Sequence, residues 1–124
     1  MSYILVVDDN KFVSSCVAVL LKKEKYHVIT ACNGTEAIDV IDHGIPKAII
    51  CDVDMPGMDG YTFVKKLKTE NVKNKIPVIM YTTNQNEQDK NKFFALGVAY
   101  YIDKRCKTEA LIHALRITCN EEPN

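Results

Sequence analysis

The sequence contains no long hydrophobic run and no excess of charge of either sign. No apolar stretch approaches the roughly 20 residues that a transmembrane helix needs, and the N-terminus begins without a signal-peptide pattern. The 16 lysines and arginines balance the 16 aspartates and glutamates, so the formal net charge is zero. Such a balance gives no electrostatic footprint for nucleic acid or an anionic membrane surface. We therefore expect a soluble, cytoplasmic protein that binds neither directly.

The cysteines lack the spacing of a metal site or a disulfide framework. The five residues are Cys16, Cys32, Cys51, Cys106 and Cys119. None forms a C-x-x-C pair, and no histidine stands at metal-ligand spacing from them. We interpret them as reduced thiols that mostly pack in the interior.

The 124 residues, 47% of them hydrophobic, suffice for one core and are too few for two. Repeats, low-complexity tracts and interdomain linkers are absent, so residues 1–124 are treated as one domain. Short apolar runs predict five strands, at 3–7, 28–31, 48–51, 78–81 and 98–102. Helical spacing predicts helices after Asn10 (with Phe12 and Cys16 among its apolar positions), after Asn33-Gly34, over 61–67, through Phe93, and from about Thr108. Lys68 to Lys75 is predicted as a polar linker and Asn84 to Asp89 as a mobile loop.

This alternation predicts the fold class. Parallel strands need long crossover connections, usually helices, so the pattern favours an α/β fold: a (βα)5 doubly wound five-stranded parallel sheet of the flavodoxin-like kind. In such a sheet the carboxyl ends of all the strands lie on one edge. Polar residues that follow different strands therefore come together there.

The stretch from Ala48 to Gly60, AIICDVDMPGMDG, places a carboxylate at such a strand end. Its apolar run is typical of a strand buried on both faces and stops at Asp52. Pro56, Gly57 and Gly60 disfavour a helix through the segment that follows. Asp52 is thus a candidate reactive or metal-binding group, although a residue that merely caps the loop would look the same from this segment alone.

Polar residues also follow the other strands. Asp8 and Asp9 end the first, Thr82 ends the fourth and Lys104 follows the fifth. Carboxylates within ~4 Å repel by roughly 4 kcal/mol at an effective dielectric near 20, so a cluster of three needs a cation. Oxygen ligands favour a hard divalent ion, and Mg²⁺ is the one we expect.

These residues resemble the receiver domain of two-component response regulators over essentially the whole chain. The resemblance is carried by Asp8-Asp9, the run from Asp52 to Gly60 (DVDMPGMDG), Thr82, Gly97, Tyr101 and Lys104. It implies that Asp52 accepts a phosphoryl group from a sensor histidine kinase or a histidine phosphotransfer protein. It also implies a signalling module rather than an enzyme, with only autocatalytic phosphoryl acceptance and slow self-dephosphorylation.

The resemblance assigns further roles. Asp9 and Asp52 would bind Mg²⁺ directly, together with the backbone carbonyl of Asp54, and Asp8 would act largely through water. Thr82 and Lys104 would contact the phosphoryl oxygens. Tyr101 would rotate on activation and remodel a partner-binding face formed by the fourth helix, fifth strand and fifth helix.

Phosphoryl transfer requires such residues in any case. It needs an in-line nucleophile, a metal and a cation that offsets accumulating charge, and Asp52, Mg²⁺ and Lys104 supply them. The Thr82 hydroxyl gains an acceptor only when a phosphoryl group is present, which would distinguish two states. By resemblance, Asp54 and Asn84 flank the path of the hydrolytic water, and we expect Asp54 to tune the lifetime of the acyl phosphate.

Two other classes remain open at this point. Asp52-Val53-Asp54 also fits a D-x-D phosphohydrolase, but that class leaves the acidic pair Asp8-Asp9 unexplained. The chain could also be a receiver-like module that binds partners without being phosphorylated.

The chain departs from the receiver pattern directly after Lys104. Arg105 stands where receivers usually place a proline, in a step that resembles a cis peptide. A cis bond before a non-proline residue costs ~2.5–4 kcal/mol, so we predict a trans or strained Lys104-Arg105 bond. We further expect Lys104 to point less directly at Asp52 until a phosphoryl group draws it in.

Overall fold

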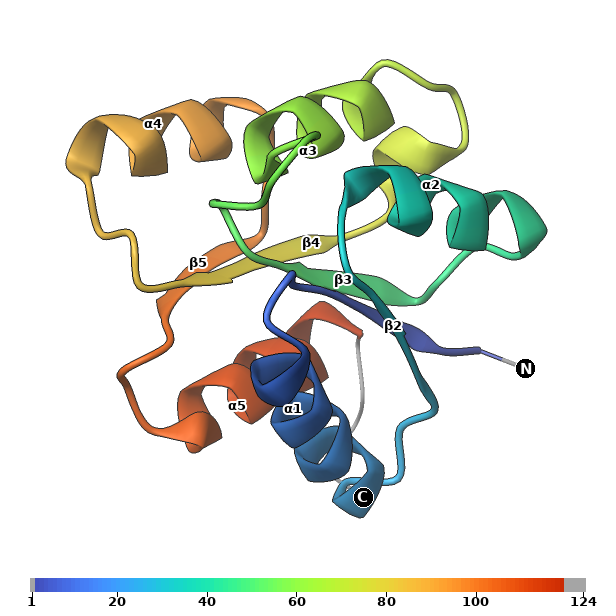
Figure 1. Ribbon diagram of the computed structural model, residues 1–124, viewed down its shortest axis with the longest axis vertical. Coiled ribbons are helices and arrows are strands. Elements are labelled where there is room, and N and C mark those ends of the chain that lie inside the picture. Colours follow the sequence, from blue (N-terminus) through green and yellow to red (C-terminus); the bar gives the residue numbers. More distant parts are fainter. Residues whose placement is uncertain (1, 120–124) are drawn as a thin grey trace.

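The computed structural model, which describes residues 2–119, is a parallel sheet with helices on both faces (Figure 1). The strands are β1 (Ile4–Val7), β2 (Val28–Ala31), β3 (Ala48–Cys51), β4 (Val78–Thr82) and β5 (Tyr100–Asp103). The helices are α1 (Lys11–Lys23), α2 (Gly34–His43), α3 (Gly60–Lys68), α4 (Glu87–Ala95) and α5 (Thr108–Thr118), with a 3-10 turn η1 (Lys73–Lys75). The predicted fold class is confirmed.

The strand order β2-β1-β3-β4-β5 places the first strand beside the third. Val7 lies opposite Cys51 in the register, so the residues that follow them, Asp8 and Asp52, leave the sheet side by side. The order in which strands are added reverses at β1: β2 lies on one side of β1, and β3, β4 and β5 lie on the other. Ligands of open α/β sheets bind at this reversal.

Two apolar layers hold the sheet. Side chains of α2, α3 and α4 cover one face, where Phe63 and Phe93 are fully buried. Helices α1 and α5 cover the other, with Leu21 and Leu111 at its centre. Figure 1 shows the same division, with α2, α3 and α4 above the sheet and α1 and α5 below it.

Side-chain caps set several helix starts. Asn10, Asn33 and Asp59 each accept a hydrogen bond from a backbone N–H of the first turn of α1, α2 and α3, respectively. Asn86 does the same for α4, so α4 begins at Glu87, inside the segment from Asn84 to Asp89 that was predicted to be a loop. The linker prediction for Lys68 to Lys75 was also partly wrong, because α3 includes Lys68 and η1 follows.

Several predicted core positions are on the surface. Phe12 is 77% exposed and Cys16 is exposed, because the buried side of α1 carries Ser14, Val17, Ala18 and Leu21. Cys106 is exposed as well, so packing in the interior holds for Cys51 but not for the cysteines as a group. Among residues 2–119, none of the helices has the length and apolarity to cross a bilayer.

Candidate functional site

Three carboxylates meet where the chain leaves β1 and β3. Oxygen atoms of Asp8, Asp9 and Asp52 lie within 4.8 Å of one another. Asp8 is 4% exposed, and its Oδ1 accepts the Asn10 N–H at 2.9 Å. Asp52 Oδ1 accepts the Val53 N–H at 2.7 Å, which fixes the rotamer of its side chain. The predicted convergence of these residues is therefore present.

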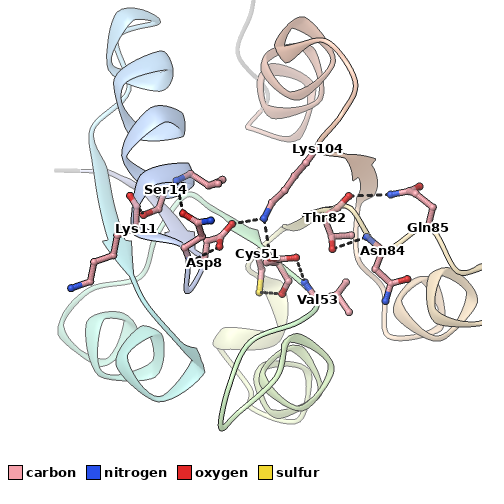
Figure 2. A network of polar contacts seen from close by, with 12 residues as sticks. Asp8, Lys11, Ser14, Cys51, Val53, Thr82, Asn84, Gln85 and Lys104 are labelled. Carbon is pink, nitrogen blue, oxygen red and sulfur yellow. Dashed lines mark hydrogen bonds and ion pairs between the residues drawn. The ribbon is translucent and has the colours of Figure 1, made fainter.

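Lys104 bridges two of these carboxylates from the end of β5. Its Nζ donates to Asp8 Oδ2 at 2.6 Å and to Asp52 Oδ2 at 2.8 Å. Figure 2 shows the side chain of Lys104 reaching across the sheet edge to Asp8, beside Cys51 and Val53. Burial lowers the pKa of Lys104, but the hydrogen bonds to Asp52 and Asp8 outweigh this effect and raise its pKa above the ordinary value.

The expectation that Lys104 points less directly at Asp52 without a phosphoryl group was therefore wrong. The peptide bonds of residues 2–119 are all trans, so the predicted trans Lys104-Arg105 bond is confirmed. The backbone accommodates it within a turn: Lys104 N–H bonds to the Thr82 carbonyl at 3.0 Å, and Cys106 N–H bonds to the Asp103 carbonyl at 3.0 Å. This turn directs the lysine over the carboxylates without a proline.

Thr82 lies at the end of β4 and is 1% exposed. Its Oγ1 accepts the Asn84 N–H at 3.2 Å, which uses a lone pair and leaves the hydroxyl proton for another acceptor. Its backbone carbonyl accepts from Gln85 Nε2 at 3.1 Å, as Figure 2 shows.

Tyr101 lies on β5 and is tied to the same loop. Its hydroxyl donates to the Asn84 carbonyl at 2.6 Å, and its ring packs on Phe93 with centroids 5.9 Å apart. Lys90 Nζ lies 5.8 Å from the ring centroid. Burial, followed by the charges of nearby aspartates, raises the pKa of Tyr101 to about 12. Asn84 thus contacts both Thr82 and Tyr101 through its backbone.

The Asp54 side chain is exposed and stands outside the group of three carboxylates. It lines an open pocket of about 250 Å³ together with Val53, Asp59, Tyr61, Asp89 and Lys92. Asn84 faces the same side: its Nδ2 donates to Asp89 Oδ2 at 2.9 Å, and its Oδ1 accepts the Asn86 N–H at 3.0 Å. The Asn84 side chain therefore supports the start of α4.

Two contacts at the site were not anticipated from the sequence. A Cβ on Gly60 would lie 2.4 Å from the carbonyl oxygen of Asp52, so only glycine allows α3 to start this close to the acidic loop. Asp103 and Arg105 form a bidentate pair beside Lys104. The glycine in the motif and the acid-basic spacing of the pair were visible in the sequence, but their contacts depend on the fold.

The donor set suits Mg²⁺. Oxygens of Asp8, Asp9 and Asp52 are close enough to share one ion, and carboxylate oxygens are the ligands that Mg²⁺ prefers. Among residues 2–119, Lys104 is the only cationic side chain that forms ion pairs with Asp8 and Asp52, so part of the local charge remains to be offset.

The sequence matches the response regulator receiver domain family over residues 4–116. The chemotaxis protein CheY4 of Vibrio cholerae is 30% identical, with a TM-score of 0.88 and coverage of 95% of this chain and 98% of that one. The signal receiver domain of a signal transduction histidine kinase from Syntrophus aciditrophicus is also 30% identical, with a TM-score of 0.87 over 100% of this chain and 95% of that one. The BeF3-activated N-terminal receiver domain of Klebsiella pneumoniae RstA, at 24% identity, a TM-score of 0.89 and coverage of 97% and 100%, shares the fold.

Receiver domains are generally signalling modules rather than enzymes, typically bind Mg²⁺ at an acidic pocket, and partner with histidine kinases in two-component systems. The fold, the strand-end cluster and the sequence match agree. The chain therefore belongs to the response regulator receiver domain family, in which accepting a phosphoryl group is the typical function.

Proposed function

We propose that Asp52 is the phosphoryl acceptor and that Asp8, Asp9 and Asp52 hold Mg²⁺, together with the backbone carbonyl of Asp54. The observation that carries the proposal is the position of Asp52 at the end of β3, with Lys104 Nζ 2.8 Å from its Oδ2. Its other oxygen, Oδ1, is held by the Val53 N–H. A carboxylate fixed in this way is a positioned nucleophile.

In the proposed step, a carboxylate oxygen of Asp52 attacks the phosphorus of a phosphohistidine. The new P–O bond forms as the P–N bond breaks, and the histidine nitrogen leaves with the bonding electron pair and takes up a proton. Mg²⁺, when bound, supplies positive charge beside the phosphoryl oxygens. Water later cleaves the acyl phosphate, which returns the Asp52 carboxylate and inorganic phosphate.

Lys104 and Thr82 contribute cationic and hydrogen-bonding groups. The Lys104 ammonium, now shared by Asp8 and Asp52, can turn to the phosphoryl oxygens that accumulate charge. The Thr82 hydroxyl is a second hydrogen-bond donor to the same phosphoryl oxygens. Because the hydroxyl proton gains its acceptor only in the phosphorylated state, Thr82 interacts differently with the two states, as a switch requires.

Tyr101 transmits the difference between the phosphorylated and unphosphorylated states to the surface of α4, β5 and α5. Its hydroxyl bonds to Asn84, whose N–H bonds to Thr82, so a displacement of Thr82 alters the support of Tyr101. A downstream protein binds this surface in our proposal, and the phosphodonor is a sensor histidine kinase or a histidine phosphotransfer protein. In our proposal, transfer takes place in the cytoplasm.

Labelling with a small phosphodonor, acetyl phosphate, tests the proposal. The parent protein should gain one acid-labile phosphate in the presence of Mg²⁺ and none with a chelator present. Asp52→Asn should abolish labelling, whereas Asp39→Asn, which removes an exposed acid on α2, should not. Mass spectrometry that placed the phosphate on Asp54 or Asp59 would contradict the assignment. Turnover of phosphate esters would indicate a phosphohydrolase instead.

A further inference from the structure

The turn after β5 is built by Asp103 and Arg105. Asp103 Oδ1 accepts the Arg105 backbone N–H at 2.9 Å, which closes an Asx-turn around Lys104. The same carboxylate binds the Arg105 guanidinium at two points, Nε to Oδ1 at 2.9 Å and Nη2 to Oδ2 at 2.8 Å. One carboxylate thus holds both the backbone and the side chain of Arg105.

Lys104 lies between the two members of this pair. Its own N–H is bonded to the Thr82 carbonyl, and Cys106 N–H returns to the Asp103 carbonyl. The backbone on both sides of Lys104 is therefore fixed by hydrogen bonds that converge on Asp103 and on the end of β4. A long flexible side chain loses less entropy in reaching its target when its backbone is already fixed.

We propose that the Asp103-Arg105 pair is a positioning device that aims Lys104 at Asp8 and Asp52. It takes the place of the proline that receivers usually carry at position 105. Neither member contacts the carboxylate cluster in the described structure, so both act through Lys104 as positioning residues. The inference rests on the proposed role of Asp52 and Lys104 and adds to it the reason that Lys104 reaches the site across a trans bond.

The geometry of the pair distinguishes it from an ordinary surface salt bridge. Exposed ion pairs contribute little unless they are bidentate or form part of a network, and this one is bidentate, with the same carboxylate also accepting the Arg105 backbone N–H. Hydrogen bonding to Arg105 lowers the pKa of Asp103, and the same contact raises the pKa of Arg105. Both groups are therefore charged across the neutral range, and the pair is not a pH switch there.

Arg105 also lines a surface groove of about 560 Å³, together with Phe12, Val13 and Lys104, between α1 and the turn after β5. The bidentate contact with Asp103 holds the guanidinium at this groove and away from the carboxylates. Without it, the free guanidinium of the residue directly after Lys104 could compete for Asp52 or Asp8.

The test compares four single variants and one double variant with the parent. Arg105→Ala removes the guanidinium and keeps the Asx-turn acceptor. Asp103→Asn keeps a side-chain oxygen for the turn and removes the charge, and Asp103→Ala removes both. Arg116→Ala is the matched control, because it deletes an exposed arginine whose guanidinium pairs with Glu24, on the α1 and α5 side of the molecule.

Two measurements are made on each protein. The first is the maximal rate and the half-saturating concentration for Mg²⁺-dependent labelling by acetyl phosphate. Because Lys104 acts on accumulating charge, we expect the maximal rate to fall by roughly tenfold in Asp103→Ala and by less in Arg105→Ala and Asp103→Asn, with smaller changes in half-saturation. The double variant Asp103→Ala/Arg105→Ala should be no slower than Asp103→Ala, because the two residues act as a unit. Arg116→Ala should match the parent.

The second measurement needs no phosphorylation. The Lys104 ammonium, shared by two carboxylates, should give an NMR resonance protected from solvent exchange in the parent, and Lys104→Met identifies it. This resonance should broaden or vanish in Asp103→Ala and weaken in Arg105→Ala.

The outcomes separate the two proposals. A parent that is not labelled contradicts the proposed function, and the ammonium resonance still tests the positioning. A parent that is labelled, with Arg105→Ala and Asp103→Asn that match it in maximal rate and in the Lys104 resonance, overturns the positioning role. Arg105→Ala keeps this test open even if Asp103→Ala does not fold, because it truncates a side chain that is 66% exposed.

Discussion

At the scale of the residue, Gly60 shows why the acidic loop has its composition. The motif turns back after Asp52 so that α3 starts against it, and Gly60 N–H bonds to the Val53 carbonyl at 2.9 Å. A side chain at this position would meet backbone: a Cβ would lie 2.4 Å from Asp52 O and 2.9 Å from Val53 Cα. Backbone cannot rotate away as a side chain can, so the clash would displace the backbone of Asp52 itself.

Gly60→Ala is accordingly expected to lower stability and slow labelling together. Overpacking of this kind costs about 1–3 kcal/mol of unfolding free energy, which urea denaturation measures. The labelling rate of the folded variant with acetyl phosphate should also fall, because the Asp52 backbone must shift. Gly44→Ala is the control, since nothing lies within 4 Å of its Cβ position and its φ of 168° is extended. A Gly60→Ala protein that matches Gly44→Ala in both measurements would contradict this explanation.

Asp54 offers a second test at the same scale. Its exposed carboxylate adds negative charge two residues from Asp52. Asp54→Asn should speed labelling by an anionic donor by roughly two- to fivefold, the size of an exposed charge interaction. The lifetime of the acyl phosphate should lengthen if the carboxylate orients water. The labelling rate and the loss of phosphate after the donor is removed are both measured, with Asp39→Asn as the control. If both rates of Asp54→Asn equal those of the parent, the Asp54 side chain has no role and only its backbone carbonyl can contribute.

At the scale of the element, one residue joins β4, α4 and β5. The backbone of Asn84 bonds to Thr82 and Tyr101, and its side chain bonds to Asn86 and Asp89 at the start of α4. Thr82, at the acidic site, and Tyr101, on β5, are thus linked through the backbone of a single residue, Asn84. In our proposal, a displacement of the Thr82 hydroxyl alters the position of the Tyr101 hydroxyl through this residue.

Tyr101 should titrate as a group held in its neutral form. Because its pKa is raised to about 12 from 10.0, the folded state binds the phenol proton more tightly than the unfolded state does. This contribution to stability is present below pH 10 and is lost as the pH rises toward about 12. Tyr101→Phe should lack this loss. Subtracting its phenolate absorbance titration from that of the parent isolates Tyr101, and a midpoint near 10 would contradict the assignment.

The elements also show how far the sequence alone could lead. The strand-end positions of Asp8, Asp52 and Thr82 were predictable, since each ends a short apolar run whose neighbours in the sheet are dictated by the fold class. The start of α4 was not predictable. Phe93 is the only buried residue of this helix, so its apolar pattern is weak, and the polar residues around Asn86 do not distinguish a helix cap from a loop. The start of β5 was predicted two residues early, because Val98, a buried residue before the strand, and Ala99 extend its apolar run.

The position of Lys104 could not be deduced for a different reason. Its direction depends on an Asx-turn and a bidentate pair, and these are set by side-chain rotamers rather than by periodicity. The exposure of Phe12 could not be deduced either. The helix around it was correctly predicted, but α1 is oriented so that Ser14 and Val17 are buried instead of Phe12.

At the scale of the whole molecule, the chain is neutral, but three carboxylates lie together at one edge of the sheet. Lys104 meets Asp8 across 96 residues of sequence, so the contact forms only when β1, β3, β4 and β5 are assembled. Lys104 offsets part of the charge of Asp8 and Asp52 in this structure. If Mg²⁺ binds as we propose, the ion and the Lys104 ammonium compete for oxygens of Asp8 and Asp52.

Lys104→Met should expose this competition. Without Mg²⁺, the variant should lose up to about 3 kcal/mol of unfolding free energy, because buried carboxylates are left without their partner. Its affinity for Mg²⁺ should nevertheless increase, since no internal cation has to be displaced. The stabilisation by Mg²⁺ follows RT ln(1 + [Mg²⁺]/Kd), so urea denaturation over a range of Mg²⁺ concentrations yields both quantities.

Lys68→Met is the matched control for this prediction. Lys68 is also partly buried, which lowers its pKa, but its Nζ donates to the Asn74 carbonyl at 3.2 Å rather than to the acidic cluster. Its removal should leave the Mg²⁺ dependence unchanged. Equal Mg²⁺ stabilisation of the parent and Lys104→Met would mean that the ion and the ammonium use different oxygens, and the competition would be refuted. If Mg²⁺ stabilises Lys104→Met more than it stabilises the parent and Lys68→Met, then Lys104 competes with the ion for the carboxylate oxygens.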